Sequence, residues 1–363
     1  MQKFSSAAPA RISWETPSVT LATSRSWPLR NTNLVLPLVG YGSAHLGELY
    51  AAVSEADSRA TLEAAWDGGI RFYDTAPWYG RGLAEHRLGG FLRTLPRDEF
   101  IVTTKVGRTL HRPPDPRHFD RAPWAGGLNF EVRFDYSYDG VMRSCEQALQ
   151  RLALDTVDAL FIHDLDAECH GEALGGHLKA LTGGGMRALG ELKKTGQIKA
   201  IGVGINTSEA LVQMLAEVDV DLALVAMPYT LLDQRCLDTG LATCVERNIS
   251  VIIGAPFASG ILARGSQSGA AYGYATAPEA IRAKVRGLEA VCAAHGVSLP
   301  AAALQFPLAH PAVVSIIPGA ARPHEVIQNI ASLEAAIPAA FWADLKVQGL
   351  VEANAPVPPG KEG

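Results

Sequence analysis

The stretch GIRFYDTAPWYG, residues 69–80, decides the fold. Its apolar run from Ile70 to Tyr73 has the length and composition of a buried parallel strand, and Asp74 follows at the carboxyl end. Tyr79 comes five residues after Asp74, in a loop rich in turn-forming residues. An aspartate at a strand end is most often a helix cap or a turn former. Taken alone, this stretch therefore predicts a buried strand and no site.

Two further apolar runs end in side chains that are equally suited to chemistry. FIVTTK, residues 100–105, delivers Lys105, and VDALFIH, residues 157–163, delivers His163. In a barrel of alternating strands and helices, the carboxyl ends of the strands meet at one face, and active sites lie there. We therefore expect Asp74, Tyr79, Lys105 and His163 to lie together.

The rest of the chain repeats the same alternation of strands and helices. Strands are predicted at 38–42, 70–74, 100–105, 157–163, 198–204, 221–226, 250–255 and 313–317, and helices at 54–67, 84–95, 138–152, 185–195, 208–216, 235–247, 278–295, 300–309 and 324–333. Eight strands that alternate with helices predict an α/β fold, the closed (β/α)8 TIM barrel of parallel strands. An open doubly wound sheet is the rival, but no GxGxxG run follows the first strand.

The predicted barrel occupies residues 29–340, between an N-terminal arm at 1–28 and a Pro-rich C-terminal tail at 341–363. Trp14 and Trp27 are expected to pin the arm to the body, and residues 29–37 are expected to form a small hairpin.

Two loops are much longer than the other connections. Residues 108–138 and 256–277 show no periodic pattern, and loops of this length inside a compact fold are usually functional or disordered. The first follows a strand that ends at the predicted site. We expect it to cover that site with Trp124, Phe130 and Tyr136.

Composition narrows the class of protein. The chain has 363 residues, 48% of them hydrophobic, and a formal net charge of -5 without any basic run, which argues against a nucleic-acid partner. No stretch has transmembrane length and the N-terminus has no signal-type apolar core, so we expect no membrane association and a cytoplasmic location. The five cysteines are scattered without paired spacing, and we interpret them as reduced packing residues.

These motifs resemble those of a known family. The run DTA at 74–76 with Tyr79, Lys105 and His163 resembles the catalytic tetrad of the aldo-keto reductase superfamily, and the resemblance extends over residues 30–335. Four shorter runs, DYSYDG (135–140), QRL (150–152), IHDLD (162–166) and ALQFPLAHP (303–311), resemble its aldose 1-dehydrogenase branch. That branch acts on L-fucose, D-arabinose, L-galactose and similar sugars, and it includes pyridoxal 4-dehydrogenase.

The resemblance implies a role for each of the four residues. Hydride transfer between a nicotinamide and a carbonyl carbon needs a proton donor or acceptor at the oxygen, here Tyr79. A phenol has an ordinary pKa of about 10, which the Lys105 ammonium is expected to lower while Asp74 holds that ammonium in place. His163 would orient the substrate oxygen. The implied reaction is oxidation of an aldose at C1 to its lactone.

The resemblance also implies a nicotinamide cofactor. The residues expected to hold it are Gly42, Ser43, Asp74, Asn206, Pro256, Phe257, Ser259, Gly260, Gly319, Glu325 and Asn329. NADPH-preferring members carry a Lys after the proline of the last strand and an Arg six residues further on, where this chain has Gly319 and Glu325. A carboxylate about 4 Å from a 2′-phosphate costs about 1 kcal/mol in water and about 4 kcal/mol at a protein surface. We therefore expect NAD to be preferred over NADP, with Arg322 as a competing phosphate ligand.

Other positions depart from the family pattern. The family often has SerAsn after the fifth strand, Gln after the sixth and an aromatic residue that stacks on the nicotinamide. This chain has GIN at 204–206, Ala226 or Met227, and Gly254 at these positions.

The substrate is expected to be a small sugar or cyclic hemiacetal, bound between Trp78, Trp124 and His163. Pyridoxal oxidation and general aldehyde or ketone reduction are the alternatives at the same site. A nucleotide-binding regulatory subunit is a rival of another class. A metal-dependent isomerase would need more ligands than the single cluster of His163, Asp164 and Asp166, so no metal is expected. The sequence leaves open a monomer or a small homo-oligomer.

Overall fold

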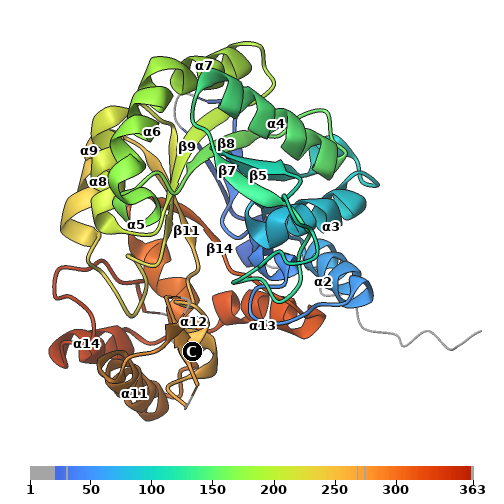
Figure 1. Cartoon of the computed structure of the whole chain (residues 1–363). Helices are drawn as coiled ribbons and strands as arrows, with labels where there is room; N and C mark the ends of the chain where they lie inside the picture. Colours follow the sequence, from blue (N-terminus) through green and yellow to red (C-terminus); the bar gives the residue numbers. More distant parts are fainter. Residues whose placement is uncertain (1–20, 30–31, 268, 274, 361–363) are drawn as a thin grey trace, which may run out of the picture.

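The computed structural model describes residues 21–29, 32–267, 269–273 and 275–360. Its centre is a sheet of eight parallel strands in the order β14-β11-β10-β9-β8-β5-β4-β3 (Figure 1). The strands are β3 (Tyr41–Gly42), β4 (Phe72–Asp74), β5 (Ile101–Val106), β8 (Ala159–His163), β9 (Ala200–Ile205), β10 (Leu222–Ala226), β11 (Ser250–Gly254) and β14 (Val313–Ile317).

The sheet closes on itself. Parallel bridges join Val39 to Ile316 and Gly42 to Gly319, and the Gly40 N–H donates to the Ile316 oxygen at 2.8 Å. The first and last strands are thus paired, and the predicted (β/α)8 barrel is confirmed.

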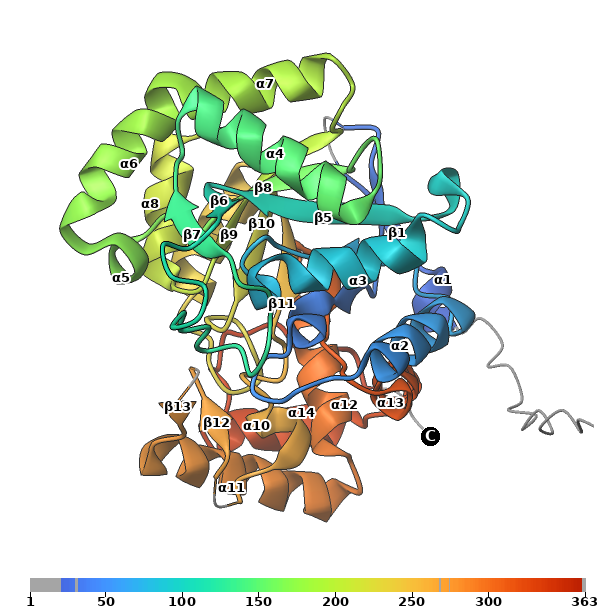
Figure 2. The same ribbon diagram turned by 45° about the vertical axis from the view of Figure 1, so that its right-hand side comes forward.

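Helices surround the barrel, and α7 and α11 lie at opposite ends of the molecule in both ribbon views (Figures 1 and 2). The longer helices are α2 (Glu55–Asp67), α3 (Leu83–Leu92), α4 (Tyr138–Leu152), α6 (Leu174–Ala180), α7 (Met186–Lys194), α8 (Ser208–Glu217), α11 (Glu279–His295), α12 (Leu299–Gln305), α13 (Pro323–Glu334) and α14 (Ala339–Val347). The shorter ones are α1 (Leu21–Ser24), α5 (Ala167–His170), α9 (Ala242–Glu246) and α10 (Ile261–Arg264). Side-chain caps at Ser54, Ser137, Thr207 and Ser298 accept a backbone N–H from the first turn and fix where four of the helices begin.

The barrel interior is layered because alternate residues of a strand face the same side. Phe72 and Phe161 belong to a buried apolar layer, and two residues further along the same strands Asp74 and His163 are also buried. The hairpin of β1 (Ser26–Pro28) and β2 (Val35–Pro37) contributes leucines to the apolar layer. The polar residues therefore form the next layer, at the carboxyl ends of the strands.

The long segment at 108–138 contains a hairpin that we had not predicted. β6 (Arg108–His111) pairs antiparallel with β7 (Glu131–Phe134), so the expectation of no regular element there was wrong. The ladder is only four residues long on each side and is half exposed, which leaves little apolar periodicity to detect. The second long segment likewise contains α10 and the two-residue strands β12 (Ala271–Tyr272) and β13 (Ala275–Thr276).

The glycine-rich segment after β8 is helical, although no helix was predicted there before residue 185. α6 runs through one π-helical turn at Leu181–Gly185 into α7. A Cβ atom on Gly185 would lie 2.2 Å from the backbone oxygen of Tyr136. Gly185 thus allows close packing against a neighbouring segment, and the glycines do not end the helix.

The ends of the barrel differ from the prediction. Trp27 is 51% exposed, so it does not pin the arm, and Trp14 lies outside the described residues. The predicted boundary at residue 340 falls inside α14, where Phe341 and Trp342 are buried with ring centroids 4.9 Å apart. Part of the predicted tail is therefore packed structure.

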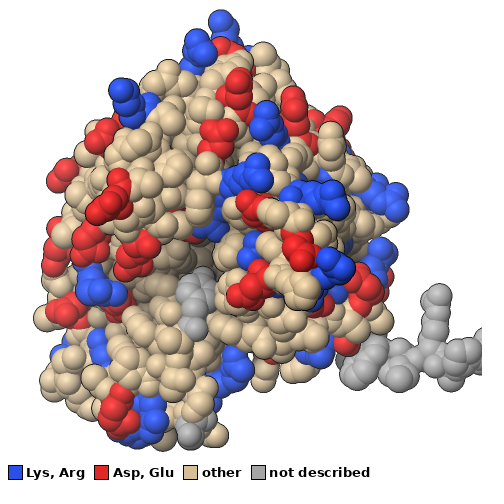
Figure 3. All heavy atoms as spheres, in the orientation of Figure 1, with Lys and Arg blue, Asp and Glu red and all other residues tan. Residues whose placement is uncertain are grey.

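Three further properties concern surface charge, helix length and the cysteines. Acidic and basic side chains are mixed over the face shown in Figure 3. Within the described ranges no single helix is long and apolar enough to cross a membrane, and one bent pair, Glu279–His295 with Leu299–Ala309, passes that test only when its two helices are taken together. Four of the five cysteines are buried and free, and Cys169 is free and exposed.

Candidate active site

Asp74 and Lys105 form a buried ion pair at the carboxyl ends of β4 and β5. Lys105 Nζ donates to Asp74 Oδ2 at 2.6 Å and to the backbone oxygen of Thr75 at 2.8 Å. Thr103 Oγ1 donates to the other carboxylate oxygen at 2.8 Å. Burial raises the pKa of Asp74, and Lys105 opposes that rise. Both residues are 1% exposed, so the charged pair is buried beneath the site.

Tyr79 begins the short 3-10 helix that follows β4. The Lys105 ammonium lies 4.9 Å from the centre of the Tyr79 ring. Burial raises the pKa of Tyr79 well above its usual value, two neighbouring carboxylates add to the rise, and Arg108 opposes it. The lowering that we expected from Lys105 is therefore outweighed, and the phenol keeps its proton at neutral pH.

His163 completes the predicted group at the end of β8. Its ring centroid lies 6.2 Å from that of Tyr79, and the two rings are nearly perpendicular at 89°. Burial lowers the pKa of His163 well below its usual value, and Arg108 and Lys105 act in the same direction. A neutral imidazole and a neutral phenol thus lie side by side, and each can form a hydrogen bond with one substrate oxygen.

A polar network that we had not predicted lies beside His163. Arg108 Nη2 donates to Asp164 Oδ2 at 2.6 Å, and Asn206 Nδ2 donates to Asp164 Oδ1 at 2.8 Å. The position of Asp164 directly after His163 could have indicated this network from the sequence. Its partners, however, come from β6 and from the end of β9, which are distant in the chain. Asn206, which we expected to hold the nicotinamide amide, is thus bound to a carboxylate.

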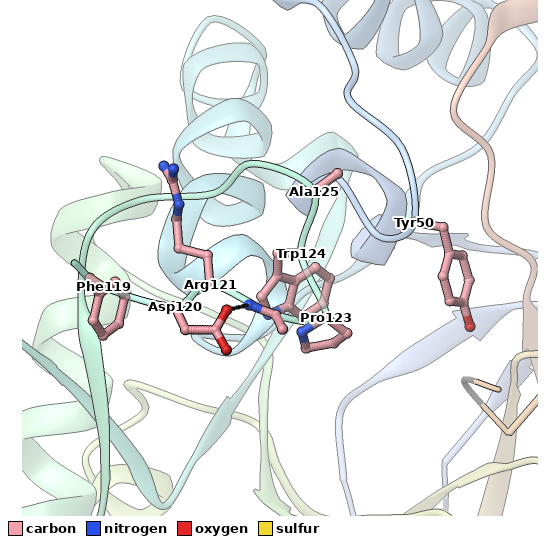
Figure 4. Close-up of a pocket in the computed structure, with 8 residues that line it drawn as sticks. Tyr50, Phe119, Asp120, Arg121, Pro123, Trp124 and Ala125 are labelled. Carbon is pink, nitrogen blue, oxygen red and sulfur yellow. Dashed lines mark hydrogen bonds between the residues drawn. The ribbon is translucent and has the colours of Figure 1, made fainter. Parts of the chain in front are cut away.

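The tryptophans lie at the site as expected. The Trp124 ring centroid lies 5.5 Å from that of Trp78 and 6.0 Å from that of Tyr79. A cavity of about 390 Å³ opens at Trp124, with Tyr50 on one side and residues Phe119–Ala125 on the other (Figure 4). Aromatic faces of this kind pack well against the C–H faces of a sugar or a heteroaromatic ring.

The other two aromatic residues expected in the cover lie elsewhere. Phe130 is 37% exposed. Tyr136 is buried and its hydroxyl donates to the backbone oxygen of His163 at 2.7 Å. Tyr136 therefore braces the catalytic strand end.

Arg81 fastens the long insert to the catalytic loop. Its guanidinium donates to the backbone oxygens of Phe130 at 3.2 Å and Asp120 at 3.3 Å, and it lies 5.1 Å from the centre of the Trp78 ring. The Leu128 N–H also donates to the Gly80 oxygen at 2.9 Å. The insert is thus held over the loop that carries Tyr79.

The residues present fit a dinucleotide along one side of the barrel mouth. A Cβ on Gly42 would lie 2.8 Å from the Ile317 oxygen, and one on Gly319 would lie 2.5 Å from His45 Nδ1, so both glycines let the chain pack closely where β3 meets the end of β14. Among the described residues, the buried hydroxyl of Ser43 has no hydrogen-bond partner. An unpaired hydroxyl at this strand end can form a hydrogen bond with a phosphate oxygen.

The segment at 254–260 forms tight turns after β11. Ala255, Ala258, Ser259 and Gly260 all have positive φ, so the chain turns tightly after β11. Ser259 Oγ accepts from the Gly273 N–H at 3.0 Å, which ties this turn to the second long segment. Pro256 and Phe257 lie within the same turn.

The residues expected to hold the adenosine part of the cofactor include one negatively charged group, the Glu325 carboxylate. Glu325 Oε2 accepts from the backbone N–H groups of Ala321 at 2.6 Å and Arg322 at 3.1 Å. Arg322 in turn pairs with Asp57 at 2.6 Å, and Asn329 Nδ2 donates to the Gly319 oxygen at 3.4 Å. The Glu325 carboxylate thus accepts from backbone N–H groups at the start of α13 (Pro323–Glu334), and these groups would otherwise attract a phosphate.

No arrangement of three or more His, Cys, Asp and Glu side chains suited to a metal ion occurs in the part of the chain that the structure describes. The side chains of Asp74, Lys105, Tyr79 and His163 offer proton transfer and hydrogen bonding around a buried ion pair.

A closed parallel barrel with a buried Asp–Lys pair, a tyrosine and a neutral histidine at the carboxyl ends of its strands defines a barrel oxidoreductase. The chain belongs to the aldo/keto reductase family, whose sequence model matches residues 38–347. Members of this family use a nicotinamide cofactor.

Three similar relatives are named for sugars or for pyridoxal. The chain is 42% identical over 340 residues to pyridoxal 4-dehydrogenase of Microbacterium luteolum, covering 91% of this chain and 99% of the relative. It is 39% identical to D-threo-aldose 1-dehydrogenase of a Pseudomonas species, covering 88% and 95%, and 30% identical to L-galactose dehydrogenase of Arabidopsis thaliana, covering 84% and 86%. Among solved structures, an aldo-keto reductase of Bacillus halodurans in its holo form matches with a TM-score of 0.67 at 22% identity, covering 91% of this chain and 97% of that one. That last similarity supports the fold alone.

Proposed function

We propose that this protein oxidises a cyclic hemiacetal to a lactone with NAD, and that an aldose oxidised at C1 is the substrate. The proposal rests on one observation. Tyr79 lies above the buried Asp74–Lys105 pair, next to His163, with Trp78 and Trp124 forming an aromatic wall beside it. Relatives named for D-threo-aldose and L-galactose support the choice of a sugar.

The residues divide the work by their chemistry. The nicotinamide, when bound, accepts the hydride that leaves the hemiacetal carbon. Tyr79, once it is ionised to the phenolate, takes the proton of the hemiacetal hydroxyl, and His163 holds the same oxygen by a hydrogen bond. Lys105, fixed by Asp74, places a positive charge near the oxygens on which negative charge develops, where it stabilises that charge. Trp78 and Trp124 exclude water and orient the ring.

Pyridoxal is the second candidate substrate. It is also a cyclic hemiacetal, so oxidation at the same C–H bond needs no change in the roles of Tyr79 and His163. The relative that is 42% identical over nearly the whole chain favours it.

We propose NAD as the cofactor because Glu325 occupies the position at which, by the resemblance, NADPH-preferring members carry an Arg. Its carboxylate is held by two backbone N–H groups, and the nearby Arg322 is already paired with Asp57. A 2′-phosphate placed there would meet the negative charge of the Glu325 carboxylate.

The test is an absorbance assay of nicotinamide reduction with NAD and, separately, NADP. The panel contains L-fucose, L-galactose, D-arabinose, pyridoxal and simple alcohols. We expect rapid NAD reduction with one of the sugars, and loss of nearly all turnover in Tyr79→Phe with nucleotide binding retained. Turnover with pyridoxal alone would select the second candidate. Silence across the panel with intact nucleotide binding would refute the dehydrogenase proposal and favour a carbonyl reductase or a regulatory subunit.

A further inference from the structure

Asp164 is the centre of the polar network beside His163. It follows β8 with a positive φ of 44°, a conformation uncommon for a residue with a side chain. Its N–H donates to the Gly204 oxygen at 2.9 Å, and each of its carboxylate oxygens accepts one side-chain donor, from Arg108 at 2.6 Å and from Asn206 at 2.8 Å. The carboxylate is therefore fixed from three directions.

This fixed carboxylate faces the His163 ring. Asp164 Oδ2 lies 3.3 Å from His163 Nε2. His163 Nδ1 is buried and has no hydrogen-bond partner among the residues that the structure describes. A neutral imidazole carries one N–H, and an ionised carboxylate can only accept. The proton is therefore stabilised on Nε2, whereas on Nδ1 it would be a buried donor without an acceptor.

We infer that Asp164, held by Arg108 and Asn206, is a positioning residue that keeps the His163 proton on Nε2, and that Arg108 keeps the ring neutral by compensating the Asp164 charge. This inference rests on the proposed function only for its kinetic consequence. The tautomer and charge of His163 are properties of the protein itself and can be measured without a substrate.

Arg108 also affects the charge of the His163 ring. A lone carboxylate beside an imidazole attracts a second proton onto the ring. Here the carboxylate is compensated by the guanidinium at 2.6 Å, and the Lys105 ammonium also faces the site from β5. Tyr79 faces His163 from the loop after β4 as a neutral phenol. The charged groups around the ring thus disfavour the imidazolium.

The consequence for the proposed reaction is a hydrogen bond of defined direction. The distance of 3.3 Å to Asp164 is longer than an ordinary N–H···O separation of about 2.9 Å. His163 Nε2–H can therefore donate to a substrate oxygen without losing a strong internal bond. The ring donates and never competes with Tyr79 for the substrate proton.

The direct test is ¹⁵N NMR of the full chain labelled at histidine, because the two ring nitrogens report the tautomer. His163→Gln assigns the signal. We expect wild-type His163 to be neutral, with the proton on Nε2, from about pH 5.5 to 8, where an ordinary histidine titrates. A wild-type ring protonated on Nδ1, or one that titrates near pH 6.5, would overturn the inference.

Asp164→Asn tests the cause. Asparagine tolerates a positive φ, and a neutral acceptor gives a hydrogen bond about half as strong as a carboxylate does. We expect a measurable population of the Nδ1–H tautomer in this variant. The matched control is Asp166→Asn, which removes the same charge two residues further along the chain. The Asp166 carboxylate accepts from the Cys169 N–H at 2.8 Å. The control should leave the His163 signal unchanged, and an unchanged signal in Asp164→Asn would refute the inference.

Arg108→Met tests the charge effect by leaving Asp164 without its cation. We expect His163 to titrate near neutral pH in this variant. With an active substrate, kcat should fall about tenfold or more and gain a new acid limb, while KM changes less. A silent substrate panel would count against the proposed function alone, because the NMR result does not depend on turnover.

Discussion

Cofactor choice is a property whose magnitude Coulomb's law bounds from a single charge, that of Glu325. The perturbation is Glu325→Gln, which removes the negative charge but keeps an oxygen that can accept from the Ala321 and Arg322 N–H groups. Two unit charges about 4 Å apart repel by about 1 kcal/mol in water and about 4 kcal/mol at a protein surface. Since each 1.4 kcal/mol is a factor of ten, the range is roughly 5-fold to 1,000-fold in the Kd of NADPH.

The structure narrows that range. Two backbone donors spread the charge of the Glu325 carboxylate, and solvent screens a half-buried group. We therefore expect Glu325→Gln to tighten NADPH binding roughly 10-fold to 30-fold and to leave the Kd of NADH within about twofold. The assay is titration of each reduced nucleotide against intrinsic tryptophan fluorescence.

Two variants on α2 serve as comparisons. Asp57→Asn frees Arg322 from its 2.6 Å ion pair, and we expect it also to tighten NADPH binding. Glu63→Gln removes an exposed carboxylate that is paired only with Arg59, and we expect no change in either Kd. An unchanged ratio of the two Kd values in Glu325→Gln, with normal thermal stability, would refute the assignment of Glu325 as the selecting group.

Three other predictions follow from buried groups. Lys105→Met leaves Asp74 as an unpaired buried charge, so we expect a stability loss of about 3–5 kcal/mol at neutral pH, measured by urea unfolding. Because burial raises the pKa of Asp74, that loss should shrink as the pH falls through this pKa and the carboxyl takes up a proton; a loss independent of pH would contradict the reasoning. The raised pKa of Tyr79 means that kcat/KM for oxidation should rise with pH from about 7 to 10, since the base must be ionised, and a plateau from neutral pH would count against Tyr79 as the base. Gly89→Ala places a Cβ 2.3 Å from a backbone oxygen of α4 and should lower stability by about 1–3 kcal/mol, whereas Gly90→Ala in the same helix meets nothing within 4 Å and should be neutral or stabilising in thermal melts.

Local patterns were sufficient to predict the barrel and the four residues at its centre. β14 at Val313–Ile317 and α4 at Tyr138–Leu152 occupy the ranges predicted for them, because a short apolar run and a capped amphipathic pattern are properties of consecutive residues. Asp74, Lys105 and His163 could be placed together because parallel strands share one carboxyl edge.

The elements that the sequence analysis did not predict have a common physical origin. No helix was predicted before residue 185, but α6 continues into α7 and Gly185 makes room for the backbone at Tyr136, which is a tertiary contact that no local pattern contains. The β6–β7 hairpin joins residues more than 20 positions apart, as the Arg108–Phe134 pair shows. The cytoplasmic location and the oligomeric state stay predictions, since they depend on what lies outside one chain.

The position of Tyr79 shows why a list of catalytic residues is not yet a mechanism. Lys105 was expected to act on the phenol directly, but its ammonium already donates to Asp74 and to the Thr75 oxygen, and both bonds direct it toward the floor of the site. The cation that opposes the rise in the Tyr79 pKa is Arg108, which is itself held by Asp164. The same guanidinium also helps to keep His163 neutral. In the proposed reaction, proton transfer at Tyr79 and hydrogen bonding at His163 would thus be coupled through the Arg108–Asp164 ion pair, and a change in Arg108 should alter both at once.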